Sequence, residues 1–82
     1  MPRFFFHVRD RHLTIFDNEG SELPDLDAAM SEAAVAARSI VADSQQRGLI
    51  EPDRWFEIVD EAGTVLAKVR FRDFLGEQPR SG

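Results

Sequence analysis

The chain has no cysteine, and its 82 residues contain no long apolar run. The absence of cysteine excludes disulfides and cysteine-ligated metal sites, and it fits a reducing compartment. The absence of a long apolar run excludes a membrane-spanning helix, which needs about 20 consecutive apolar residues. No segment has the apolar stretch and small-residue cleavage site of a signal peptide. We therefore expect a cytoplasmic protein with no membrane association.

Basic residues are also scarce, with 10 Lys and Arg against 15 Asp and Glu. The net charge of −5 disfavours nonspecific nucleic-acid binding, which depends on neutralising phosphates. The charges are unevenly distributed, because six acids and no base lie between His12 and Ala37. Seven of the ten bases lie in or beside segments that we predict to be strands, namely Arg3, Arg9, Arg11, Arg54, Lys68, Arg70 and Arg72.

The sequence contains no pattern that is typical of an active site. No serine occurs in a Gly-x-Ser-x-Gly or Ser-x-x-Lys context, and the glycines are too widely spaced for a phosphate-binding loop. His7 and His12 are the only imidazoles, and Asp10 is the only carboxylate near them in sequence. We therefore predict a protein that is not an enzyme, with no catalytic, cofactor-binding or metal-binding residues and no small-molecule substrate.

Three adjacent phenylalanines, Phe4 to Phe6, are the most informative feature that is present. Side chains of a strand alternate between its two faces, so in a strand from Arg3 to Arg9 Phe5 points away from Phe4 and Phe6. A single small core can cover only one of these faces. The opposite face, with Phe5, is a candidate site for self-association or for a partner.

The rest of the first half predicts a hairpin followed by a helix. A turn at 10–12 leads into a second strand at 13–16, and 17–20 is a turn by composition. Asp25 is a good N-cap for a helix that ends near Arg47, with Gly48 as the C′ residue. Its predicted buried face consists mostly of small residues, namely Leu26, Ala29, Met30, Ala33, Ala37, Ile40, Val41 and Ser44.

A short connection at 49–53 leads to a second hairpin, formed by strands at 54–60 and 64–71, whose register is ambiguous. A turn with Gly63 as a bulge pairs Asp60 with Thr64 and places Trp55 and Val59 on the same face as Val65, Val69 and Phe71. A shift of one residue instead joins Phe56 and Ile58 to Val65, Val69 and Phe71. The shifted register places Glu57 opposite Lys68 and Trp55 opposite Arg70. We favour the shifted register because both cross-strand pairs are favourable.

The predicted order is therefore β-β-α-β-β, which is an α+β fold. Its simplest form is a four-stranded, mainly antiparallel sheet with one helix packed on one face. We expect one domain over residues 1–75, a last turn at 72–75 and a flexible tail at 76–82.

Three segments together, MPRFFFHVRD, DNEGSELPDLDAA and WFEIVDEAGTVLAKVRF, resemble a family of small alphaproteobacterial proteins of unknown function. Members of this family typically have a Met-Pro-x-aromatic-Phe-Phe start, an Asp-x-x-Gly turn before a Leu-Pro-Asp-Leu helix entry, and a Phe-x-Val-x-Asp-x-x-Gly hairpin. The resemblance covers about residues 1–75 and implies a bacterial cytoplasmic protein. It implies no activity, substrate or site residue.

The open sheet face is thus the one candidate site. Its predicted partner-binding residues are Phe5, His7, Arg9, Trp55, Leu66, Lys68 and Arg70. Aromatic residues and arginine are typical anchors of protein interfaces, so we predict a non-enzymatic interaction or regulatory module. It would self-associate, as a homodimer, through this face or a sheet edge, or bind another protein. Aromatics among bases on a sheet also fit nucleic-acid binding, which we rank second because of the acidic net charge.

Overall fold

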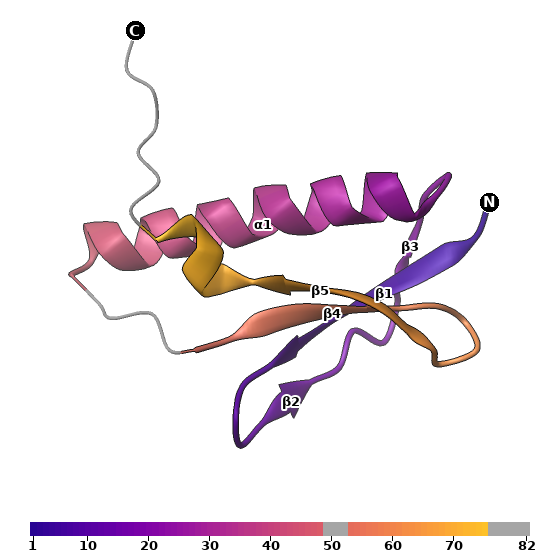
Figure 1. Cartoon of the computed structure of the whole chain (residues 1–82), viewed down its shortest axis with the longest axis horizontal. Helices are drawn as coiled ribbons and strands as arrows, with labels where there is room; N and C mark the ends of the chain where they lie inside the picture. The colour runs from indigo at the N-terminus through magenta and orange to yellow at the C-terminus, as the bar shows by residue number, and fades with distance from the viewer. Residues whose placement is uncertain (49–52, 76–82) are drawn as a thin grey trace, which may run out of the picture.

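The computed structural model describes residues 1–48 and 53–75 and confirms the α+β class (Figure 1). The predicted tail at 76–82 and residues 49–52 of the predicted connection lie outside the described residues. The elements are β1 (Arg3–Arg9), β2 (Thr14–Ile15), β3 (Ser21–Glu22), α1 (Leu26–Gln46), β4 (Trp55–Val59), β5 (Val65–Arg70) and the 3₁₀ helix η1 (Phe71–Phe74).

The sheet is antiparallel, in the order β2-β1-β4-β5, with β1 in its interior. β3 also pairs with β1, next to Arg3 and Phe4, on the edge that β2 uses next to Val8 and Arg9. The sheet therefore has five strands, and the prediction of four omitted β3. The second strand is also shorter than predicted, because only Thr14 and Ile15 pair with β1.

Asp17 closes the gap between β2 and β3 along the edge of β1. Its Oδ2 accepts a hydrogen bond from the backbone N–H of Phe6 at 3.1 Å, and its own N–H donates to Nδ1 of His7 at 3.1 Å. Its Oδ1 accepts from the N–H of Gly20 at 3.1 Å, which holds the predicted turn. A carboxylate thus supplies hydrogen bonds that a continuous strand would supply with its backbone.

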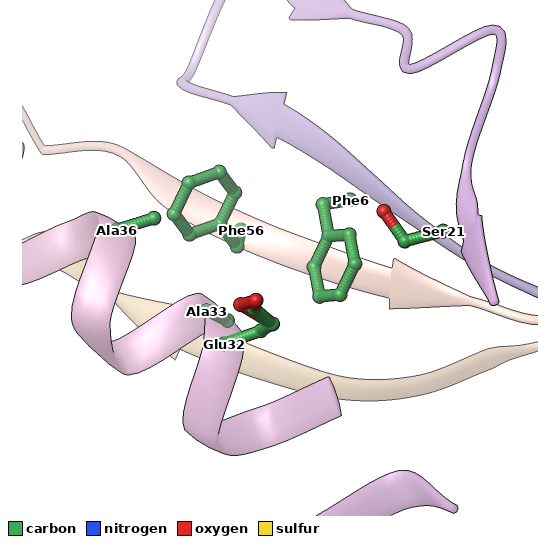
Figure 2. A pocket seen from close by; sticks show the side chains of 6 residues that line it. All are labelled: Phe6, Ser21, Glu32, Ala33, Ala36 and Phe56. Atoms are coloured by element: carbon green, nitrogen blue, oxygen red, sulfur yellow. The ribbon is translucent and has the colours of Figure 1, made fainter. Parts of the chain in front are cut away.

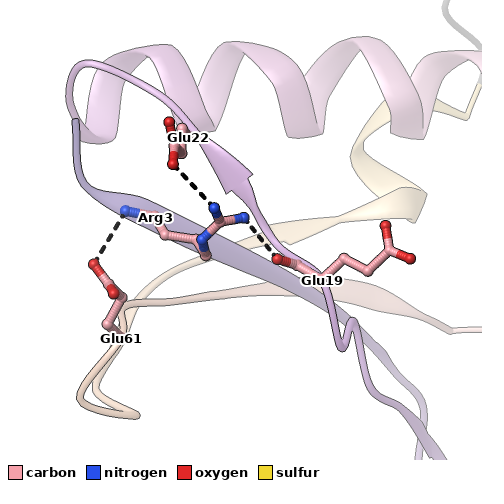
Figure 3. Close-up of polar contacts among 4 residues, drawn as sticks. All are labelled: Arg3, Glu19, Glu22 and Glu61. Carbon is pink, nitrogen blue, oxygen red and sulfur yellow. Dashed lines mark hydrogen bonds and ion pairs between the residues drawn. The ribbon is translucent and has the colours of Figure 1, made fainter.

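Arg3 connects the start of β1 to two distant turns (Figure 3). Its guanidinium donates to the carbonyl oxygen of Glu19 at 2.8 Å and to Oε1 of Glu22 at 3.0 Å. Its backbone N–H donates to Oε1 of Glu61 at 3.4 Å. The turn before β3 and the turn between β4 and β5 are therefore held at the same end of the sheet.

The helix α1 begins and ends as its sequence predicts. Oδ1 of Asp25 accepts from the N–H of Ala28 at 2.8 Å, and Gly48 follows the helix with φ +70°. The residues of α1 that are fully buried against the sheet are Ala29, Ala33, Ala37 and Val41. Met30 was predicted to share this face, but its side chain is 41% exposed.

The core lies between α1 and one face of the sheet. Phe4 is 5% exposed and packs in the same cluster as the helix alanines, while Phe6 and Val8 are partly buried against it. The rings of Phe56 and Phe71 meet edge to face at 4.9 Å between centroids. Small residues on α1 let large rings on the sheet approach closely, which confirms the predicted division of Phe4 and Phe6 from Phe5.

The register of the second hairpin combines the two alternatives. Near the turn, Asp60 pairs with Thr64 and Val59 with Val65, as in the first alternative. A β-bulge then shifts the register, and the rest of the hairpin follows the second alternative, with Trp55 opposite Arg70. The prediction that Val65 joins the core was therefore wrong, and its side chain is 47% exposed.

Candidate functional site: the outer face of the sheet

The outer face is the face of the sheet opposite α1. The helices of the described residues, α1 and η1, both pack on the core side of the sheet (Figure 1). The pairing between β1, β4 and β5 arranges this face in three cross-strand rows. These rows are Phe5-Val59-Val65, His7-Glu57-Lys68 and Arg9-Trp55-Arg70.

The structure therefore brings together six of the seven predicted partner-binding residues. The exception is Leu66, which lies at the bulge of β5 and has no registered partner on β4, although it is 37% exposed. A bulge adds one residue to a strand and breaks the strict alternation of faces from which the position of Leu66 was predicted.

Glu57, in the middle row, is only 6% exposed, and its charge is paired with that of Arg9 in the same chain. Nη1 of Arg9 lies 3.1 Å from Oε1 and 3.2 Å from Oε2 of Glu57. The Nζ of Lys68 lies 5.9 Å from the centre of the Trp55 ring, within cation–π range. The Arg9-Trp55-Arg70 row and Lys68 together form what we call the basic end of the outer face.

Two donors at the basic end have no hydrogen-bond partner among the described residues. These are Nε of Arg9 and Nε1 of Trp55, and both atoms are buried. Arg9 and Trp55 are cross-strand neighbours, so the two unused donors belong to the same row. Buried donors are usually satisfied, so leaving these two without a partner is a local cost to stability.

The opposite end of the outer face carries an open cavity of about 280 Å³, which we call the acidic cavity. Its lining residues include Phe5, His7, Phe16, Asp17, Asp60 and Glu61. The rings of His7 and Phe16 meet edge to face at 5.1 Å, and Phe16 is 63% exposed. Exposed aromatic rings beside carboxylates form an environment that favours a cation.

The sequence analysis did not include Phe16, Asp17, Asp60 or Glu61 in the candidate site. Asp17 and Asp60 were interpreted only as turn residues, which they are, since Oδ1 of Asp60 accepts from the N–H groups of Ala62 and Thr64. Phe16 follows Thr14 by two residues and so shares the face of Arg9, which is the signal that could have identified it.

The carboxyl of Asp17 is held in its charged form. Burial by itself raises the pKa of this group, but hydrogen bonds from the backbone N–H groups of Gly20, Phe6 and Glu19 outweigh burial. A smaller electrostatic interaction with the His7 side chain acts in the same direction as these bonds. The pKa of Asp17 is therefore lower than that of an ordinary carboxyl.

The two histidines are not brought together. His7 accepts from the N–H of Asp17, while His12 lies in the first turn, where its N–H donates to Oδ1 of Asp10 at 2.7 Å. Hydrogen bonds from His12 and Leu13 lower the pKa of Asp10. Within residues 1–48 and 53–75, no three His, Cys, Asp or Glu side chains are grouped as metal ligands.

Apart from the acidic cavity, an apolar groove of about 250 Å³ lies on the helix side of the sheet (Figure 2). Figure 2 shows Phe6 and Ser21 on one wall and Glu32, Ala33 and Ala36 of α1 on the other, with Phe56 between them. The groove forms because α1 packs on β4 and β5 more than on β1. None of the predicted partner-binding residues lines it.

A family model for a domain of unknown function, DUF6894, matches residues 3–72 of the chain. The chain belongs to the DUF6894 family. This match covers both hairpins and α1, and it confirms the resemblance to a family of unknown function. Comparison with curated proteins and with solved structures found no match. Within the described part of this DUF6894 protein, no helix has the length and apolar character required to cross a bilayer.

Proposed function

We propose that this protein is a non-enzymatic interaction module that self-associates through the outer face of its sheet. The observation that carries the proposal is the separation of charge along that face. At the basic end Lys68 and Arg70 add positive charge beyond the Arg9–Glu57 pair, and the acidic cavity at the other end carries Asp60 and Glu61. A face with opposite charges at its two ends is complementary to a second copy of itself turned end to end.

A two-fold axis between two stacked faces, running across the strands, produces this arrangement. Such an axis lays the Phe5-Val59-Val65 row of one copy over the Arg9-Trp55-Arg70 row of the other. The middle rows then lie over each other. Sheets that stack face to face pack about 10 Å apart with strands aligned to within about 30°, which this arrangement permits.

The sheet edges support self-association less well than the face. β5 is the long free edge, and it carries Lys68, Arg70 and a β-bulge, which are features that oppose pairing with another strand. The opposite edge of β1 is already paired with β2 and β3 and bonded to Asp17. We therefore assign the interface to the face.

Nucleic-acid binding is the second candidate, and the basic end is the observation that favours it. Trp55 beside Lys68 is an arrangement on which a base can stack near a phosphate. Phe5, by contrast, lies beside Asp60 and Glu61, whose charges repel phosphates. A strand of nucleic acid would therefore have favourable contacts over only part of the face.

Light scattering and sedimentation at micromolar to high micromolar concentration test the proposal. We expect the wild type to form dimers and Trp55→Ala to weaken them, with retained folding checked by circular dichroism. Val35→Ala is the matched control, because Val35 is 63% exposed on α1. A wild type that stays monomeric at high micromolar concentration would contradict the proposal.

A fluorescence-anisotropy titration with single-stranded RNA and DNA at low salt tests the second candidate. Binding that weakens with added salt supports it, and no binding at low salt excludes it. We further infer, from the family resemblance and the lack of cysteine, a cytoplasmic protein of alphaproteobacterial origin.

A further inference from the structure

We infer that the acidic cavity is a binding site for the guanidinium group of Arg70 from a second copy of this chain. The inference rests on the proposed self-association and names the contact that would direct it. Its first support is the chemistry of the cavity, where the rings of Phe5 and Phe16 lie beside the carboxylates of Asp60 and Glu61. A guanidinium stacks on aromatic rings and pairs with carboxylates, so both features favour the same ligand.

The second support is that Arg70 is unused within its own chain. Arg9 is paired with Glu57, and Lys68 lies over the Trp55 ring. Arg70 is exposed and, among the described residues, its side chain makes no ion pair or ring contact. It is therefore the basic side chain of the outer face that can bind elsewhere without breaking an existing contact.

The third support is position. Arg70 ends the Arg9-Trp55-Arg70 row, and the acidic cavity lies beside Phe5 and Val59 at the other end of the same face. The two-fold axis proposed above keeps each strand over the same strand of the other copy, so it lays Arg70 of one copy over Val65 of the other. Val65 lies next to the turn whose Asp60, Glu61 and Gly63 line the cavity. By symmetry each dimer then contains two identical contacts, with one cavity and one Arg70 contributed by each copy.

The cavity also tolerates a ligand without losing its own structure. Oδ1 of Asp60 is committed to its turn, but Glu61 is exposed and its one described bond is the 3.4 Å contact with the N–H of Arg3. Phe16 is 63% exposed and contacts His7. Glu61 and Phe16 are therefore the lining residues that a guanidinium can approach.

Mixing two variants tests the contact. Arg70→Ala keeps the cavity and removes its ligand, while the double variant F16A/E61Q keeps Arg70 and alters the cavity. Gln at position 61 preserves an oxygen that can accept from Arg3. Each variant alone loses both contacts of its dimer, and we expect its dimer dissociation constant to rise roughly tenfold or more. A mixture restores one contact in the heterodimer.

Sedimentation and fluorescence energy transfer between differently labelled variants measure the outcome. The inference predicts that the mixture associates more tightly than either variant alone and more weakly than wild type. Arg47→Ala is the matched control, because it removes the same charge from an exposed arginine at the end of α1, away from the outer face. If the control variant weakened the dimer as much as Arg70→Ala does, the effect would be one of general charge, and the inference would be overturned.

The two proposals fail in different ways. Wild-type dimers that are weakened by Trp55→Ala but not by Arg70→Ala would overturn the Arg70 contact and leave the interface standing. A mixture that associates no better than its components would do the same. A wild type that is monomeric at high micromolar concentration would overturn both proposals.

Discussion

At the scale of single residues, Asp17 and Gly20, which lie beside β1, have roles beyond their local turn. Asp17 completes the hydrogen bonding of β1 at Phe6, and Gly20 lies where the loop passes close to β1. A Cβ added to Gly20 would lie 2.9 Å from Cγ of Arg3 and 2.9 Å from Cε2 of Phe5. Both positions therefore affect the surroundings of the Phe5 side chain.

Gly20→Ala should destabilise the protein by about 2–4 kcal/mol, since strain at φ +71° adds to the close contacts. Gly63→Ala is the matched control, because Gly63 has φ +86° but nothing within 4 Å of the added Cβ. That control should lose only about 1–2 kcal/mol, from backbone strain alone. Urea unfolding measures both, and equal losses would contradict the close approach.

Asp17 should make stability depend on pH. Its pKa is lower folded than unfolded, so the stabilisation is fully present above the unfolded value of about 4 and is lost as pH falls through the folded value. Asp17→Asn should flatten the stability profile in this acidic range and lower stability at neutral pH.

Urea unfolding between pH 2.5 and 7 checks this prediction. Asp43→Asn serves as the control, since Asp43 is an exposed helix residue that pairs with Arg47 at the surface. If the profile of Asp17→Asn were parallel to that of wild type, the assigned hydrogen bonds would not stabilise the carboxylate.

At the scale of elements, close packing of α1 on the sheet depends on its alanines. Ala37 is 0% exposed, and the rings of Phe56 and Phe71 belong to the same core cluster. A larger side chain would push the helix away from the strands or force rings out of their positions.

Ala37→Leu should therefore cost about 1–3 kcal/mol of stability. Ala42→Leu, at an exposed position of the same helix, should change stability by about 0.5 kcal/mol or less. Thermal and urea unfolding of the pair distinguish overpacking from helix propensity, which is the same in both. Equal stability of the two variants would show that α1 does not pack tightly at Ala37.

The elements also show how much of the fold the sequence predicts. Helix α1 and its N-cap at Asp25 were predictable, because apolar spacing and cap chemistry act locally. β3 was missed because Ser21 and Glu22 carry no apolar alternation, and their pairing depends on the distant Arg3. The bulge was missed because each single register accounts for only part of the hairpin. The turn that pairs Asp60 with Thr64 fits the first register, and the pairing of Trp55 with Arg70 fits the second, so a bulge must lie between them.

The candidate site was predictable to a similar extent. Alternation along β1 and β4 places Phe5, His7, Arg9 and Trp55 on one face. The acidic cavity could not be predicted in this way, because it unites Phe16 of the first hairpin with Asp60 and Glu61 of the second. Residues from separate turns come together only through the pairing of β1 with β4.

At the scale of the whole molecule, the net charge is −5, but the two ends of the outer face carry charges of opposite sign. Average charge predicts mutual repulsion between copies. Its distribution predicts attraction in one orientation and repulsion in the others, which favours a single geometry of association.

Self-association through this face should therefore weaken with added salt. Raising ionic strength from about 0.02 to 0.5 M shortens the range of charge interactions from roughly 20 Å to below 5 Å, so the dimer dissociation constant should rise. Sedimentation across this series measures it. Association that strengthens steadily with salt would indicate an interface held by apolar contact alone.

The interior position of β1 also has a consequence for synthesis. Phe4 and Phe6 are made before β4, which pairs with their strand, and before Phe71, which belongs to the same core. The N-terminal hairpin thus stays without its core until β4 and Phe71 have left the ribosome. The core can therefore close only after Phe71 has been made, and until then the nascent chain exposes the aromatic residues of β1.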